Sequence, residues 1–92
     1  MTKRERAKVA ALRQYVHIPD WGYGAVTIKT LRWRLENEPK APLSPLEKFT
    51  LELCCWRYRR KLGGLVDFDL PTEEPLRSDY FPVRETVQEP LL

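Results

Sequence analysis

The sequence predicts a mainly α-helical protein, a small domain of three helices followed by an extended acidic C-terminal arm. Apolar residues recur at helical spacing in several stretches, and two segments begin with the residue pattern of a helix N-cap. The chain after residue 70 contains four prolines and has no helical period. With 92 residues, it can bury only a modest core. We expect a basic helical domain over 1–64 and the arm over 65–92.

The first helix is predicted over 3–16. Thr2 and Glu5 have the spacing of a capping box, in which each side chain accepts a hydrogen bond from the backbone of the other residue. The apolar positions that follow recur at i, i+3 and i+7, so they should face the core. The helix should end before Pro19, because the residue preceding a proline is driven out of the α region.

The stretch TIKTLRWRL, residues 27–35, is expected to form the second helix. The preceding residues 20–24, DWGYG, have turn chemistry. As a helix, 27–35 places Ile28, Leu31 and Leu35 on one face. As a strand, it would place apolar residues on both faces, and only one of those sets could pack against a core. The helix is therefore favoured.

The third helix is predicted from the segment SPLE to Leu62. Ser44 suits the N-cap, Pro45 suits the first helical position, and Glu47 completes the pattern. Gly63 and its neighbour Gly64 should end the helix. The apolar residues of this segment occupy most of the helix circumference, which indicates a central helix that is contacted on several sides. They are Leu46, Phe49, Leu51, Leu53, Cys54, Trp56, Tyr58 and Leu62.

The arm differs from the body in pattern and in charge. Residues 65–70 alternate briefly, which suits a short edge strand or an extended arm, and the chain from Pro71 onward is expected to be extended. Residues 1–62 hold 14 Lys and Arg against 6 Asp and Glu, a net charge of +8, whereas residues 63–92 hold 2 against 7, a net charge of −5. A basic body favours phosphate groups or an acidic partner surface.

The composition also indicates a compartment. No apolar run approaches the length of about 18 residues that a membrane span needs. The N-terminal segment has no apolar core typical of a signal peptide. Cys54 and Cys55 are adjacent and have no other cysteines to pair with, so a disulfide framework is not expected. We predict a reduced, cytoplasmic protein without a membrane partner.

Catalysis has little support in the sequence. His17 is the single histidine, and no serine or cysteine is recognisably paired with it. The two adjacent cysteines lack the second pair that a zinc site would need. The four glycines match no phosphate-binding loop. We expect a protein that is not an enzyme and that has no metal, cofactor or small-molecule substrate.

Nucleic acid is the first candidate partner. The residues VTIKTLRWRL resemble the recognition helix of helix-turn-helix DNA-binding proteins, and this resemblance implies that Thr27 caps the helix or contacts phosphate. The preceding turn, 17–24, is about twice the usual length for that motif. A solvated charged face, with cations that complement a helix dipole, is the alternative. The predicted nucleic-acid-binding residues are Lys29, Arg32, Arg34, Arg57, Arg59 and Arg60.

A protein is the second candidate partner. Exposed aromatic residues are typical anchors of protein interfaces, and the arm could add a strand to the edge of a partner's sheet. The alternative is that the aromatic residues of the arm cover the protein's own core, in which case its carboxylates should pair with arginines of the body. The predicted protein-binding residues are Trp21, Tyr23, Phe68, Tyr80 and Phe81.

These observations predict a non-enzymatic binding protein. The first expectation is a DNA-binding regulatory or accessory protein that uses a basic helical surface. The alternative is a protein-binding inhibitor or adaptor, of the mobile-element or phage type, that engages a larger complex through its aromatic loop and its arm.

Overall fold

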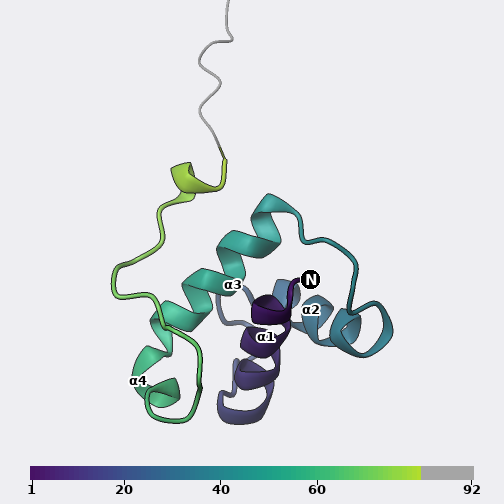
Figure 1. Ribbon diagram of the computed structural model, residues 1–92. Helices are drawn as coiled ribbons and strands as arrows, with labels where there is room; N and C mark the ends of the chain where they lie inside the picture. The colour runs from purple at the N-terminus through teal and green to yellow at the C-terminus, as the bar shows by residue number, and fades with distance from the viewer. Residues whose placement is uncertain (82–92) are drawn as a thin grey trace, which may run out of the picture.

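The computed structural model describes residues 1–81, and it confirms the mainly helical fold class. Three helices of 13 residues form the body: α1 (Lys3–Tyr15), α2 (Ala25–Asn37) and α3 (Pro45–Arg57). A single turn of helix, α4 (Arg59–Leu62), follows α3, and a 3-10 turn, η1 (Arg77–Asp79), lies in the arm. Figure 1 shows α3 running diagonally behind α1, with α2 on the other side of the body from α4.

Both predicted capping boxes are present. Thr2 and Glu5 exchange hydrogen bonds at the start of α1, and Ser44 and Glu47 do the same at the start of α3, where Pro45 occupies the first turn. These bonds satisfy backbone N–H groups that have no partner within the helix. The starts of α1 and α3 are therefore determined by their own residues.

Residues 27–35 are helical, which confirms the choice of helix over strand, and α2 begins two residues earlier at Ala25. Gly24 precedes it with φ +78°, and a Cβ atom there would lie 2.8 Å from Cγ2 of Thr50. Only glycine accommodates both the left-handed backbone and this close approach to α3. Gly24 thus fixes where α2 crosses α3.

The prediction of one continuous third helix to Leu62 was wrong. The backbone leaves the α region at Tyr58, with φ −103° and ψ 19°, and α4 starts again at Arg59. The break redirects the chain so that Leu62 packs against the core with no exposed surface. Gly63 and Gly64 follow α4, as the sequence predicted for the helix end, and Gly64 has φ +82°.

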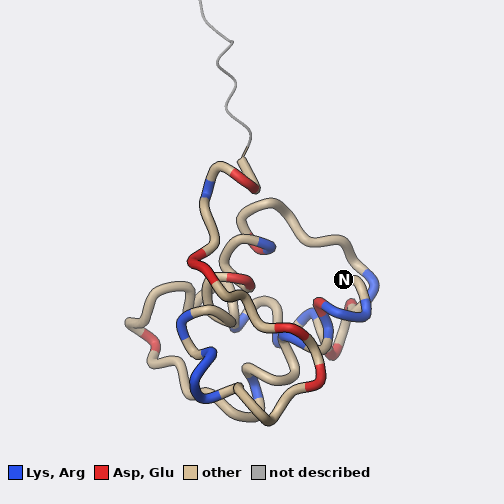
Figure 2. The backbone as a smooth tube through the Cα atoms, turned by 60° about the vertical axis from the view of Figure 1, so that its left-hand side comes forward, with Lys and Arg blue, Asp and Glu red and all other residues tan. Residues whose placement is uncertain are grey.

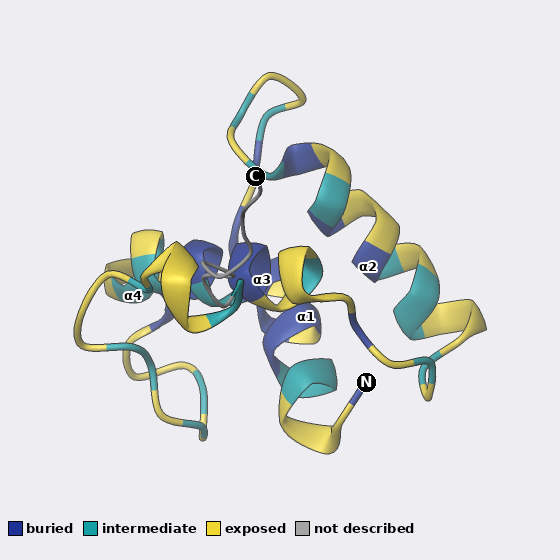
Figure 3. Ribbon diagram, turned by 90° about the horizontal axis from the view of Figure 1, so that it is seen from above, coloured by how far each residue is buried: buried dark blue, intermediate teal, exposed yellow. Residues whose placement is uncertain are grey.

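The core lies where the three long helices meet. The side chains of Leu12, Ile28 and Leu51 are fully buried there, one from each helix, as Figure 3 shows by the buried inner faces of the helices. An ion pair between Lys8 and Glu52 joins α1 to α3 beside this core.

The first part of the arm is extended and packs on the body. Residues 65–70 form no strand, so of the two predicted alternatives the extended arm describes this part of the chain. Val66, Phe68 and Leu70 instead pack against the core at alternate positions. Apolar packing therefore holds this segment in place, without a neighbouring strand.

Candidate functional site

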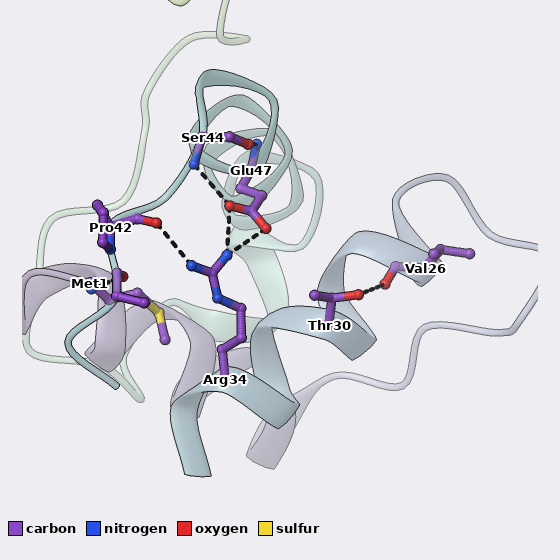
Figure 4. A network of polar contacts seen from close by, with 8 residues as sticks. Met1, Val26, Thr30, Arg34, Pro42, Ser44 and Glu47 are labelled. Carbon is purple, nitrogen blue, oxygen red and sulfur yellow. Dashed lines mark hydrogen bonds and ion pairs between the residues drawn. The ribbon is translucent and has the colours of Figure 1, made fainter. Parts of the chain in front are cut away.

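Arg34, which the sequence placed on an outward nucleic-acid-binding face, holds the body together instead. Its Nη1 donates to both carboxylate oxygens of Glu47 at 2.8 and 2.7 Å, and its Nη2 donates to the Pro42 carbonyl oxygen at 2.9 Å (Figure 4). The side chains of Arg34 and Glu47 are only 16% and 17% exposed. Arg34 thus ties α2 to the start of α3 and to the turn before it.

Glu47 serves two structural roles at once. Burial raises the pKa of its carboxyl group, but the backbone N–H of Ser44 and the guanidinium of Arg34 outweigh burial, so the pKa lies below its ordinary value. The carboxylate is therefore ionised at neutral pH, and it neutralises Arg34 within the fold.

The other two predicted residues of α2 differ: Lys29 remains 59% exposed, whereas Arg32 is partly enclosed. Lys29 forms an ion pair with Asp20 in the preceding turn, and its hydrogen bond is the largest cause that lowers the pKa of the Asp20 carboxyl group. Arg32 is half-buried, and its Nε is enclosed with no hydrogen-bond partner among residues 1–81. The structure therefore does not bring Lys29, Arg32 and Arg34 together as one exposed basic face.

The outward side of α2 presents apolar as well as charged side chains. Val26 is 77% exposed and Trp33 is 55% exposed, and their separation of seven residues places them on the same side of the helix. Between them, Thr30 donates its hydroxyl hydrogen to the Val26 carbonyl oxygen, and near the helix end Asn37 donates to the Trp33 carbonyl oxygen. These two polar side chains bond their own helix, whereas Lys29 and Glu36, exposed on the same side, pair with Asp20 and Arg13.

The turn before α2 and the start of α3 extend this apolar surface. Trp21 is 88% exposed, and Tyr23 and Leu46 are about half exposed. A cleft of about 270 Å³ between the start of α2 and α3 brings Tyr23, Val26 and Leu46 together. We call this surface the α2 face: Tyr23, Val26 and Leu46 line the cleft, Trp21 precedes them in the chain, and Trp33 lies two turns further along α2.

The second predicted basic group lies at the junction of α3 and α4. The guanidinium of Arg57 lies 5.2 Å from the ring centre of Tyr23, and that of Arg59 lies 4.6 Å from the ring centre of Trp56. Arg59 also donates to the Trp56 carbonyl oxygen at 2.8 Å. Arg60 is exposed, and so is its neighbour Lys61.

The aromatic residues of the arm contact their own chain. Phe68 packs against the core, and the rings of Tyr80 and Phe49 meet edge to face at 5.7 Å. Burial raises the pKa of the Tyr80 hydroxyl. Phe81 lies under the guanidinium of Arg77, which belongs to the arm itself. The alternative in which the arm covers the body therefore describes Phe68 and Tyr80.

The ion pairs expected from that alternative are not formed within residues 1–81. The four ion pairs of this region all join residues of the body, and none includes a carboxylate of the arm. Figure 2 shows the acidic positions spaced along the arm. Apolar contacts, rather than charge pairing, hold the arm on the body.

The two cysteines have the environment of small core residues. Burial raises the pKa of Cys54 to about 11 and that of Cys55 to about 12, so both thiols are protonated at neutral pH. Over residues 1–81, no group of three or more His, Cys, Asp or Glu side chains is placed to hold a metal ion.

Sequence reasoning missed two features of this surface. Leu46 was assigned to the apolar surface of the third helix, but it is 45% exposed on the α2 face. Its position directly after Pro45 was the available signal, because side chains in a first helical turn often extend past the partner helix. The role of Arg34 had no signal in the sequence, since its partner Glu47 was already explained by the capping box.

Comparisons with protein-family models, with curated proteins and with solved structures found no match to this chain. In the part of the chain that the structure describes, no helix has both the length and the apolar character that crossing a membrane requires.

Proposed function

We propose that this chain is a non-enzymatic protein-binding module and that the α2 face receives an apolar segment of a partner protein. One observation carries the proposal, the meeting of the exposed side chains of Tyr23, Val26 and Leu46 around a cleft at the start of α2. Contiguous exposed apolar surface of this kind marks interaction sites. Trp, Tyr and Arg are also the residue types that contribute most to binding at protein interfaces.

The surroundings of the cleft suggest the charge of the partner. The guanidinium of Arg57 lies over Tyr23, which lines the cleft. Lys29 and Asp20, both exposed, pair with each other and together add no net charge. A cation beside an apolar centre complements a segment that has one large apolar side chain next to Asp or Glu.

DNA reading by α2, the first expectation from the sequence, has less support. A recognition helix presents polar and cationic side chains to base edges. The outward side of α2 presents Val26 and Trp33 with Lys29 as the exposed cation of this helix, whereas Arg34 is bonded to Glu47. A protein partner accounts for this surface more directly.

Selection from a random peptide library on the immobilised full chain tests the proposal. The enriched peptides should share Leu, Phe or Trp next to acidic residues. V26D should weaken the binding of a selected peptide by at least roughly tenfold, or about 1.4 kcal/mol, in fluorescence anisotropy. Aspartate is compatible with the first turn of a helix, so the variant should remain folded.

L76D provides the matched control, because Leu76 is 60% exposed in the arm, away from the α2 face. It introduces the same charge and should leave the affinity unchanged. The proposal fails if no peptides are enriched, or if V26D and L76D have equal effects.

A further inference from the structure

The cations at the α3–α4 junction exceed what the helices need. A helix C-terminus favours nearby positive charge, and Arg57 lies in the last turn of α3 while Arg59 donates to the Trp56 carbonyl oxygen. These contacts account for two cations. Arg60 and Lys61 belong to a helix of only four residues, and their side chains are exposed. The helix dipole therefore gives no sufficient reason for this second pair.

No negative charge of the body or of the described arm neutralises these residues. None of the ion pairs within residues 1–81 includes Arg57, Arg60 or Lys61. Asp67 and Asp69 follow a few residues later, but they line a cleft beside Lys3 and other residues of α1. The first acidic residues of the arm therefore lie near the N-terminal end of α1 and not beside α4.

The arrangement favours a ligand that requires charge alone. At the junction itself, the ring of Trp56 is covered by the guanidinium of Arg59. A protein interface needs an apolar centre among its charges, whereas the phosphate backbone of a nucleic acid is bound by cations without one. Arginine is also well suited to phosphate, because its planar fork can donate two parallel hydrogen bonds.

We propose that Arg57, Arg60 and Lys61 form a binding site for the phosphate backbone of duplex nucleic acid. They lie within five residues of the chain, with Arg57 before the break at Tyr58 and Arg60 and Lys61 after it. A four-residue helix offers too little length to lie along a groove and read bases. Binding is therefore independent of base sequence. Arg57 also lies beside the α2 face, but the substitutions that test this site change only Arg60 and Lys61, so the site does not rest on the proposed protein-binding function.

Anisotropy of a short labelled DNA duplex, measured with the full chain at two salt concentrations, tests the site. Three phosphate contacts give a slope of about −2.7 in log K against log salt, so a fourfold rise in salt should weaken binding roughly 40-fold. R60E/K61E should abolish most of this binding. R60Q/K61Q removes the charges without reversing them, and it should lower the slope to about −0.9.

K40E/K48E is the matched control, because it makes the same change in net charge at exposed lysines near the start of α3. Circular dichroism verifies that each variant is folded. The site is supported if K40E/K48E retains binding while R60E/K61E loses it. It is overturned if the full chain does not bind the duplex, or if both double variants lose binding equally. Equal competition by polyglutamate at the same charge concentration also overturns it, since the cluster would then be a general polyanion surface. These outcomes do not depend on whether V26D affects peptide binding, so the two proposals can fail separately.

Discussion

Replacing Arg34 with alanine should destabilise the fold far more than a typical surface substitution. The change removes three hydrogen bonds, two to Glu47 and one to the Pro42 carbonyl oxygen. It also leaves a carboxylate that is only 17% exposed without its cation. The expected consequence is a weakened connection between α2 and the start of α3.

The magnitude follows from the burial of the pair. Removing one partner of a fully buried ion pair costs about 3–5 kcal/mol. About a sixth of each side chain remains accessible here, and Glu47 keeps its bonds to Ser44, so we expect a loss of about 2–3 kcal/mol. For a domain of this size, that loss lowers Tm by roughly 10–20 °C.

Urea unfolding followed by circular dichroism measures the effect, and R13A is the matched control. Arg13 pairs with Glu36 at 2.6 Å, but the two side chains are 51% and 56% exposed, so its loss should cost less than about 1 kcal/mol. A double-mutant cycle of R34A with E47Q should give a coupling energy of about 1–3 kcal/mol. If R34A is as stable as R13A, Arg34 does not have the structural role assigned to it, and it returns as a candidate for ligand contact.

Three further predictions follow from single contacts. The folded-state pKa of Glu47 lies below the ordinary value of 4.5. Its ionised carboxylate therefore stabilises the fold above about pH 4.5, and this contribution is lost as the pH falls through the lowered pKa. The free energy of unfolding, measured across this pH range, should depend less on pH in E47Q than in the unmodified protein. G24A should destabilise more than G64A, because both have positive φ but only the Cβ at position 24 meets Thr50; a smaller loss for G24A in urea unfolding would contradict this. Cys54 and Cys55 should react with a thiol reagent at pH 8 only on unfolding; rapid labelling of the native protein would show that they are accessible.

Local signals in the sequence determined the helical class and most of the helix boundaries. The capping boxes at Thr2 and Ser44 depend on side chains and backbone groups three residues apart, so they can be read without knowledge of the fold. The choice of helix for 27–35 depended on a periodicity that is likewise local. The broad division into a basic body and an acidic arm required only a count of charges.

The candidate sites depended on contacts between distant parts of the chain. Arg34 and Lys29 are of the right residue type to bind phosphate, but Glu47 and Asp20 engage them, and neither partner follows from the spacing of α2 alone. The arm lies on the body through Phe68 and Tyr80, although its charges suggested ion pairs.

The sequence by itself determined which residues could form helices and which could carry charge to a ligand. Only the tertiary structure decided which of those charges remain available, and which apolar side chains, such as Val26 and Leu46, lie outside the core. The physical reason is that helix formation depends on neighbours within a few residues. The exposure of a side chain depends instead on the helix that packs against it, and the sequence spacing of one helix does not specify that partner.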